Sequence, residues 1–391
     1  MTARHSHRDE RGISLIIVSF GLLGFLAATT LAIDVGMMMM ARSQAQNSAD
    51  AGALAGATAL VFNSFTDRSS TGPAVTSAVS TALANPIAGQ APSVLTSDVT
   101  FPNDPSGNPT RVAVNVFRTE ARSNAVPTFL GGMFGVPTAD IGASATAEAS
   151  PANAGTCVKP FMIPDKWIEK VDSKGVLDGP WTPDSTFDMV DSSGKPLANP
   201  DVYVPLGQPG YTGYSASDYG RQLILRAGTG NNISPTMYYS WKMPGDIGGN
   251  FYSNNISGCN QTVISFVPGT PYYMTQEPGN MVGPTDDGID ALIARDPAAT
   301  FDTSCNCVKG STYGVSPRVT PIPLYDPIYY ETGKLNGRNA DFKLANIIGF
   351  FVDKRVGNQV YGYVMPLLGT IDSTAGPAPT GSFPMAIRLV Q

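Results

Sequence analysis

The cellular location of the protein is decided by residues 12–33, GISLIIVSFGLLGFLAATTLAI, which contain no charged side chain. At 1.5 Å per residue, a helix of this length measures about 33 Å and can cross a bilayer core of about 30 Å. Three arginines lie within residues 1–11, whereas only Arg42 follows the stretch closely. Because positive charge stays in the cytoplasm, we expect a cytoplasmic tail at 1–11, a transmembrane helix at 12–33, and export of the rest. Cleavage as a signal peptide after Ala32 is the alternative, but the apolar region of such peptides is shorter.

The helix is expected to continue beyond the membrane over residues 34–62. This stretch begins DVGMMMMARSQAQNSADAGALAGATALV, without proline and with many good helix formers. Small residues recur along the whole helix in two groups: Gly24, Ala28, Ala32 and Gly36 in the membrane, and Ala45, Ala49, Gly52 and Gly56 beyond it. Small side chains let helices approach closely. We interpret both groups as helix-packing faces, turned toward another helix or toward the protein's own globular part; the alternative is that alanine is merely a good helix former.

These residues resemble the N-terminal region of the TadE/TadG-like family of Flp (tight-adherence) pilus assembly proteins. The matching features are Arg11-Gly12, the apolar span, Ile33-Asp34-Val35-Gly36, Arg42, Gln46-Asn47, Ala49-Asp50-Ala51 and Ala53-Leu54-Ala55-Gly56. The residues that carry the family motif are Asp34, Gly36, Asn47 and Asp50. The resemblance implies a single-pass protein of the bacterial inner membrane, with its bulk in the periplasm or at the cell surface. Its implied partners are other pilus-assembly or envelope proteins, or a further copy of the chain.

The sequence differs from related proteins in two features that limit what the resemblance implies. Pilins of these systems are cut after a glycine that is followed five residues later by glutamate, but Ile17 stands five residues after Gly12. Many TadG-like proteins carry a von Willebrand A domain with a DxSxS metal site. The nearest string here, at residues 372–376, has threonine and glycine in place of the two serines. We therefore expect neither prepilin-type processing nor that metal site.

Composition divides the exported part near residue 150, because all 15 tyrosines, all 3 tryptophans and all 4 cysteines come after it. We predict an α+β protein: a small pilin-like α+β module at 63–150 and a β-rich exported domain at 151–391. In the module, the patterns predict a helix at 73–85, a short helix at 127–134, and strands at 94–101, 111–118 and 139–147. In the second domain they predict strands at 203–206, 222–227, 262–267, 347–352 and 360–368, and a helix at 285–295 that Thr285 caps.

Charge and motifs exclude several functions. A net charge of −6 and a pI near 5.0 argue against nucleic-acid binding. Both histidines, His5 and His7, lie in the tail, so the main body has no histidine-based catalytic triad or histidine-ligated metal site. The chain contains no GxGxxG, GxxxxGK, GxSxG or HExxH motif. We assign no catalytic residue, cofactor or metal ion, and we do not expect an enzyme.

The cysteines Cys157, Cys259, Cys305 and Cys307 are expected to form two disulfides, because the domain is exported. Of the three pairings, we favour two long-range bridges that join the first two cysteines to the last two, since a local bridge across one residue is strained. A redox CxC centre or a four-thiolate metal site is the alternative. Separately, the acids at residues 286, 287 and 290 suit a helix start, with calcium binding as the alternative.

Two functional hypotheses follow. The first is a membrane-anchored, non-enzymatic component of a Flp/Tad-type pilus assembly system that acts through protein–protein contacts. The second is an envelope-anchored binding module for a glycan or a surface partner, carried by residues 151–391. Tyr325, Tyr329 and Tyr330 are a candidate sugar platform for the second hypothesis, against the alternative that they pack in the core.

Overall fold

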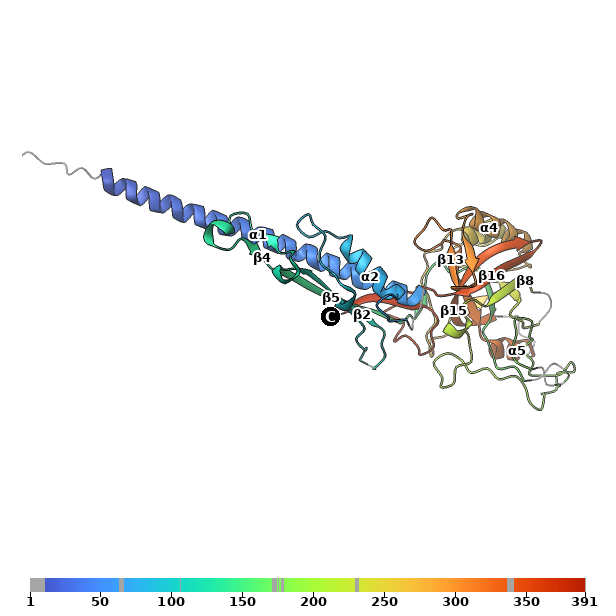
Figure 1. Ribbon diagram of the computed structural model, residues 1–391. Coiled ribbons are helices and arrows are strands. Elements are labelled where there is room, and N and C mark those ends of the chain that lie inside the picture. Colours follow the sequence, from blue (N-terminus) through green and yellow to red (C-terminus); the bar gives the residue numbers. More distant parts are fainter. Residues whose placement is uncertain are drawn as a thin grey trace, which may run out of the picture. The chain divides into compact units, whose positions relative to one another are not determined.

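The computed structural model describes residues 11–62, 67–105, 107–170, 174, 176, 179–228, 232–335 and 341–390. The predicted cytoplasmic tail, apart from Arg11, lies outside these residues. The chain forms two compact units, which are described one at a time (Figure 1). Unit 1 comprises Met1–Ala57, Asp67–Glu148 and Arg388–Gln391, and unit 2 comprises Thr58–Thr66 and Ala149–Ile387.

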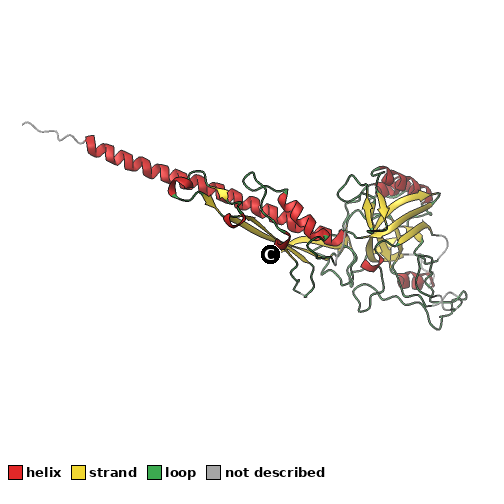
Figure 2. Cartoon of the chain, viewed as in Figure 1, coloured by secondary structure: helices red, strands yellow, loops and turns green. Residues whose placement is uncertain are grey.

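The N-terminal helix α1, Arg11–Phe62, runs without interruption through the predicted transmembrane segment and the predicted extension (Figure 2). This confirms the long helix expected from the sequence. Over the apolar span its large side chains are exposed, among them Leu15, Phe20 and Phe25. The helix is long and apolar enough to cross a membrane, and such an apolar surface is characteristic of a bilayer-spanning segment.

The rest of unit 1 packs on the second half of α1. Helix α2, Pro73–Leu83, lies alongside it (Figure 1), and a four-stranded sheet has the order β1-β2-β5-β17. The strands are β1 Val99–Thr100, β2 Arg111–Arg118, β5 Ile141–Pro151 and β17 Met385–Val390. In β2, Val112, Val114 and Val116 are fully buried and alternate with half-buried neighbours, as the pattern predicted. The predicted helix at 73–85 and strand at 111–118 are thereby confirmed.

Two predicted elements of unit 1 are shorter than expected. At 94–101 the chain makes the 3-10 turn η1, Thr96–Asp98, before β1, because the buried Asp98 accepts hydrogen bonds from the backbone N–H of Leu95 and from Arg122. At 127–134 only the 3-10 turn η3, Gly131–Phe134, forms, since glycine disfavours helix. Around these elements lie η2 Glu120–Arg122, β3 Val126–Pro127 and β4 Thr138–Ala139; the last two pair as a small hairpin.

The last strand corrects the expectation that residues 151–391 stay together. β17 is formed by the C-terminal residues, yet it joins the sheet of unit 1 beside β5. An ionic cluster accompanies this pairing: the carboxylate of Glu148 lies 2.8 Å from the Arg111 guanidinium and 3.1 Å from the Arg388 guanidinium. Because Glu148 is buried, these partners compensate its loss of hydration.

Unit 2 is built on a seven-stranded sheet of order β11-β15-β14-β7-β9-β8-β16, in which β15 also pairs with β16. This extra pairing closes six strands into a barrel-like sheet and confirms the β-rich character predicted for this part. The pairs β14–β7 and β8–β9 are parallel, and the other pairs of this sheet are antiparallel. The strands are β7 Phe161–Pro164, β8 Gln222–Ala227, β9 Met237–Ser240, β11 Tyr273–Thr275, β14 Val319–Tyr325, β15 Asp341–Val356 and β16 Gln359–Met365.

The closure depends on the 16-residue strand β15. Its middle pairs with β14 and its end pairs with β16, and a register shift between Val352 and Lys354 bends it. Gly349 and Gly362 lie at this seam, where an added Cβ would strike a carbonyl oxygen of the facing strand. The core inside contains Trp167, Trp241, Tyr325, Tyr330, Phe342 and Phe350, all buried.

The remaining elements of unit 2 surround this barrel. They are β6 Ala154–Gly155, η4 Ala216–Asp218, α3 Gly249–Ser257, β10 Ile264–Ser265, α4 Val282–Ala294, β12 Thr300–Asp302, β13 Cys307–Lys309 and α5 Pro327–Leu335. Residues 203–206 form no strand, and of the predicted strand at 262–267 only β10 forms, paired with β6. The predicted cap by Thr285 is wrong: α4 begins earlier, and Thr285 is buried and donates to the Tyr252 hydroxyl of α3.

The cysteines form two disulfides, but the favoured long-range pairing is wrong. Cys157 is joined to Cys259, and Cys305 to Cys307. The first pair is brought together by its neighbourhood, because the backbone N–H of Cys157 donates to the carbonyl of Asn260 at 2.9 Å. The second pair spans the turn between β12 and β13, where Asn306 adopts a left-handed conformation with φ of 51°.

Removing the long bridge, with Cys157→Ala and Cys259→Ala together, is expected to lower the free energy of unfolding by about 3–5 kcal/mol, because it constrains a long unfolded loop. Removing the Cys305–Cys307 bridge should cost only about 1–2 kcal/mol, because its loop is short. Peptide mapping without reduction checks the pairing in protein purified from membranes, and denaturant unfolding of the full chain in detergent compares the variants. Equal losses, or a recovered peptide that joins Cys157 to Cys305, would contradict the pairing.

Candidate functional site

The small residues of the α1 extension form a packing face inside unit 1. Ala45 and Ala49 are fully buried. A Cβ added at Gly52 would lie 3.0 Å from the Ala78 carbonyl oxygen of α2, and one added at Gly56 would lie 2.8 Å from Cγ1 of Val112 in β2. Side chains larger than hydrogen at the two glycines would therefore push α2 or β2 away. The structure thus brings Ala45, Ala49, Gly52 and Gly56 together against the protein's own globular part.

The small residues of the apolar span are placed differently. Ala28 and Ala32 are exposed, and a Cβ added at Gly24 or Gly36 would meet no atom within 4 Å. This group, Gly24, Ala28, Ala32 and Gly36, is called the span stripe below. It leaves a narrow face of α1 along which a second backbone could approach closely.

Of the family-motif residues, Asp34 and Gly36 lie at the end of the span stripe, whereas Asn47 and Asp50 lie within the extension. The Asp34 carboxylate accepts hydrogen bonds from the backbone N–H groups of Phe129 at 2.7 Å and Leu130 at 3.3 Å. Further along α1, the Asp50 carboxylate accepts from the Gln46 amide at 2.8 Å, and that amide also donates to the Ser144 carbonyl at 3.2 Å. Asp34 therefore connects α1 directly to the segment at Phe129, whereas Asp50 holds the Gln46 amide that contacts Ser144 of β5.

Asn47 and Gly36, the other motif residues, are exposed. A groove of about 650 Å³ runs beside Asp50, between α1, the middle of β5 and the end of β17, and is lined by Gln46, Asp50, Ser144, Ala145, Thr146, Leu389 and Val390. Together with Asn47, this groove leaves one side of the extension accessible to a partner.

Sequence reasoning missed three contacts that hold α1 in unit 1. Ser48 is fully buried and donates to the Ala82 carbonyl of α2 at 2.9 Å, and the Gln44 amide oxygen accepts from the Ala88 N–H at 2.8 Å. The third is the partnership of Asp34 with the segment near Phe129. The only signal in the sequence for the contact with Asp34 is the uncharged stretch at residues 125–139.

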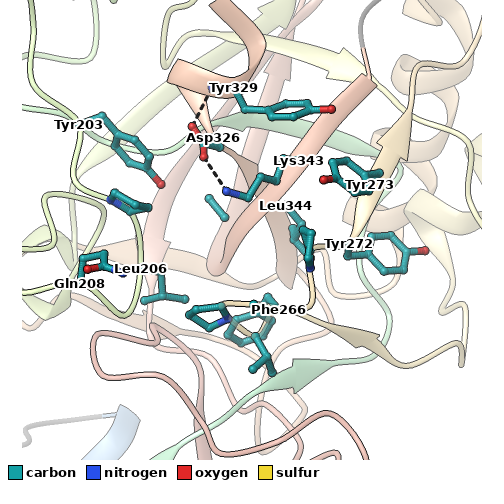
Figure 3. Close-up of a pocket in the computed structure, with 16 residues that line it drawn as sticks. Tyr203, Leu206, Gln208, Phe266, Tyr272, Tyr273, Asp326, Tyr329, Lys343 and Leu344 are labelled. Atoms are coloured by element: carbon teal, nitrogen blue, oxygen red, sulfur yellow. Dashed lines mark hydrogen bonds and ion pairs between the residues drawn. The ribbon is translucent and has the colours of Figure 1, made fainter. Parts of the chain in front are cut away.

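Unit 2 contains a separate pocket of about 390 Å³ with an aromatic rim (Figure 3). Asp326 precedes α5 and caps it, accepting from the N–H of Tyr329 at 2.9 Å. Its other oxygen pairs with Lys343 of β15 at 3.1 Å. The rings of Tyr273 and Tyr329 lie 5.6 Å apart at the rim. By contrast, Tyr325 and Tyr330 are buried in the core, so of the predicted tyrosine platform only Tyr329 lines the pocket.

A buried carboxyl group lies behind one wall of this pocket. The Tyr203 hydroxyl donates to Asp165 at 3.0 Å, and the Tyr211 hydroxyl donates to it at 2.9 Å. Burial raises the pKa of Asp165 to about 6, although these bonds and the N–H groups of Lys166 and Tyr214 favour the charged form. Burial, together with the nearby Asp201 carboxylate, raises the pKa of Glu169 to about 7.

The acids at the start of the predicted helix 285–295 have a structural role. Asp290 pairs with Arg355 of β15 through both oxygens, at 2.9 and 2.5 Å, and Asp286 lies 3.8 Å from the same guanidinium. Arginine thus occupies the position that the calcium alternative would require for a cation. Among the residues that the structure describes, no group of three or more His, Cys, Asp or Glu side chains is placed to hold a metal ion.

Unfolding of unit 2 should depend on pH in a defined direction. Because the folded-state pKa values of Asp165 and Glu169 exceed the ordinary values of 3.8 and 4.5, the folded protein binds more protons between about pH 4 and 7. The contribution of these two groups to the free energy of unfolding should therefore rise as pH falls from 7 to 5. Asp165→Asn should flatten this slope by up to about 1.4 kcal/mol per pH unit. Thermal unfolding in detergent measures it, with the exposed Asp184→Asn as control; an unchanged slope in Asp165→Asn would count against the assignment.

The comparisons with known proteins concern the N-terminal helix. Residues 12–59 match the family model for TadE/G-like proteins of Flp pilus assembly. No curated protein and no solved structure matches the chain. The matched range holds the apolar span, the motif residues Asp34 and Asp50, and the packing face that ends at Gly56. Residues 12–59 of this chain, most of helix α1, are therefore similar to the TadE/G-like domain of Flp pilus-assembly proteins.

Proposed function

We propose that the protein is a membrane-anchored component of a Tad-type pilus assembly system that acts through protein–protein contacts and without catalysis. The observation that carries the proposal is the division of α1. Its first half is apolar and exposed, as a lipid-facing helix is, and its second half is packed into unit 1. The family match over residues 12–59 covers both halves and supports a pilus-related role.

In this proposal, α1 crosses the bacterial inner membrane once, with its N-terminus in the cytoplasm and residues 34–391 exported. Three arginines before the span support the orientation. The two disulfides support export, because such bonds persist in oxidising compartments. The disulfide mapping described above therefore also tests export: free thiols in protein taken from cells would contradict it.

Because its second half is packed into unit 1, α1 connects the membrane rigidly to the rest of unit 1. Because Gly52 and Gly56 lie in close contact with α2 and β2, a movement of the helix in the membrane is passed on to unit 1. The small-residue face beyond the membrane is used internally, so it is not a partner surface. The surfaces that remain for partners are the span stripe and the accessible side of the extension near Asn47.

Ala28→Leu is expected to leave membrane insertion intact but to reduce the recovery of partner proteins, and pilus assembly, several-fold. Leucine scarcely changes helix propensity, but it prevents close approach along the span stripe. The measurement is co-purification from membranes together with a pilus count. Ala27→Leu, at the same depth and also exposed, is the matched control. Thr30 is unsuitable as a control because it is buried.

Wild-type recovery of partners and normal pilus numbers in Ala28→Leu would show that the span stripe is not a contact surface. Equal losses in Ala28→Leu and Ala27→Leu would lead to the same conclusion, because the two positions face different sides of α1. Either result would leave the groove beside Asp50 as the remaining candidate for partner contacts.

A second candidate function is favoured by the pocket of unit 2. Its tyrosine rings can stack on the apolar faces of a sugar, and Asp326 and Lys343 offer hydrogen-bonding groups beside them (Figure 3). In this alternative, the helix α1 anchors a glycan-binding module in the envelope.

A glycan array probed with the full chain in detergent tests this alternative. Tyr329→Ala should abolish binding, because it removes one side of the aromatic rim, while the backbone N–H at position 329 still donates to Asp326, which caps α5. Tyr313→Ala changes an exposed tyrosine outside the pocket and should bind as the wild type does. No glycan bound by the wild type, or equal binding by Tyr329→Ala, would remove the alternative.

A further inference from the structure

The hairpin β3–β4 carries an exposed apolar loop. The sequence from Ala125 to Ala139 contains no charged residue. Between the two short strands, the large side chains point away from any core: Phe129 is 65% exposed, Met133 81% and Phe134 62%. Soluble surfaces seldom gather so many large apolar side chains in one short loop. We call residues 126–139 the hairpin loop.

The position of the hairpin loop along α1 is set by Asp34. Its carboxylate accepts the N–H groups of Phe129 and Leu130, at 2.7 and 3.3 Å, and Asp34 directly follows the apolar span. In Figure 1 the loop lies against the middle of α1. The covered face of the helix already begins at Thr30, which is 7% exposed, whereas Leu26, one turn earlier, is 51% exposed. At 1.5 Å per residue, the covered face of α1 therefore starts about 6 Å before the end of the predicted span at Ile33.

The helix remains apolar beyond this point. Asp34 is the only charged residue between Arg11 and Arg42. Past it, Val35, Met39 and Met40 are exposed. A carboxylate near hydrocarbon is costly unless hydrogen bonds replace its hydration, and the loop's backbone supplies such bonds. The loop backbone thus donates hydrogen bonds to Asp34, the one charged residue on this long apolar surface. The loop also adds its own apolar side chains at the same depth.

We propose that the hairpin loop inserts into the membrane interface beside α1 and forms a second lipid contact of unit 1. The proposal rests on the proposed membrane anchor, and it commits to lipid as the occupant. Lipid is favoured because the Asp34 bonds hold the loop at the end of the apolar span, where the bilayer surface must lie. Apolar side chains gain free energy on moving from water into this region.

A second contact with the membrane restricts motions that a single spanning helix allows. A single spanning helix can turn about its axis and tilt, and interfacial anchors limit both motions. With Phe129, Met133 and Phe134 in the interface on one side of α1, the rotation of the helix is set. Because α1 is continuous and packed into unit 1, the loop contact thereby fixes how the span stripe faces relative to the membrane surface.

A probe at the tip of the loop tests the proposal in the full chain. Met133→Cys adds one thiol for an environment-sensitive fluorophore, because all four native cysteines are paired in disulfides. The labelled protein is reconstituted into vesicles of phosphatidylethanolamine and phosphatidylglycerol, with and without spin-labelled lipid. Ser80→Cys, on the exposed side of α2, is the control site. We expect blue-shifted emission and several-fold stronger quenching by spin-labelled lipid at position 133 than at position 80.

Flotation of the same samples with the vesicles reports the anchor separately. Protein that floats but gives equal, weak quenching at both sites would overturn the loop proposal and leave the anchor in place. Blue-shifted emission at position 133 without lipid quenching would also overturn it, because the loop would then be covered by protein, such as a second copy. Failure to float would instead overturn the proposed anchor.

Asp34 acts as a positioning residue in this proposal. In the Met133→Cys background, Asp34→Ala should reduce lipid quenching several-fold while the protein still floats, because the N–H groups of Phe129 and Leu130 lose their acceptor. Asp34→Asn keeps a side-chain oxygen that can accept one of these bonds and should restore most of the quenching. Full quenching in Asp34→Ala would overturn the role of Asp34 in placing the loop.

Discussion

The close approach between the second half of α1 and the rest of unit 1 is the contact on which the other features depend. At Gly56 there is no room for a Cβ, because Val112 of β2 would lie 2.8 Å from it, and at Gly52 the Ala78 carbonyl of α2 is nearly as close. Ala45 and Ala49 extend the same face toward the membrane. A glycine in a helix costs about 1 kcal/mol of propensity, and here packing offsets that cost. Because the helix is held so closely, the exposed apolar half projects from a rigid base.

Asp34 lies where the packed second half of α1 meets its exposed apolar first half. A carboxylate between two apolar stretches would ordinarily interrupt a lipid-facing surface. Here its charge is met by two backbone N–H groups of the hairpin loop. The same bonds connect a family-motif residue to a segment almost a hundred positions away. The Asp34 position of the motif therefore has a structural role within unit 1.

Unit 2 is held together by other means. The strand β15 bends at its register shift and pairs on both sides, which closes the barrel-like sheet. Large aromatic side chains fill the interior, and the Cys157–Cys259 disulfide joins segments that are 102 residues apart. Buried carboxyl groups such as Asp165 sit among tyrosine hydroxyls next to the pocket. The barrel-like sheet thus holds the rim of the pocket, which includes Tyr273, Tyr329 and the Asp326–Lys343 pair.

Local patterns in the sequence determined the apolar span, the continuous helix to Phe62 and the strand at Arg111–Arg118. These features depend on the period of apolar residues and on the absence of breakers, which neighbouring residues alone decide. The even number of cysteines likewise indicated two disulfides. Their pairing was decided only in three dimensions, since it depends on which loops meet: Cys157 lies beside the segment that contains Cys259.

Tertiary structure alone decided three further features: which side of the α1 extension is used internally, where the hairpin loop lies, and that the C-terminal strand joins the sheet of unit 1. The recurrence of small residues is alike around Ala49, which is buried, and around Ala28, which is exposed. The 3.6-residue period shows that small residues share a face, but it does not show what covers that face. The partner of Asp34 and the neighbour of β17 are likewise contacts between distant segments, whose formation depends on the packing of the whole unit.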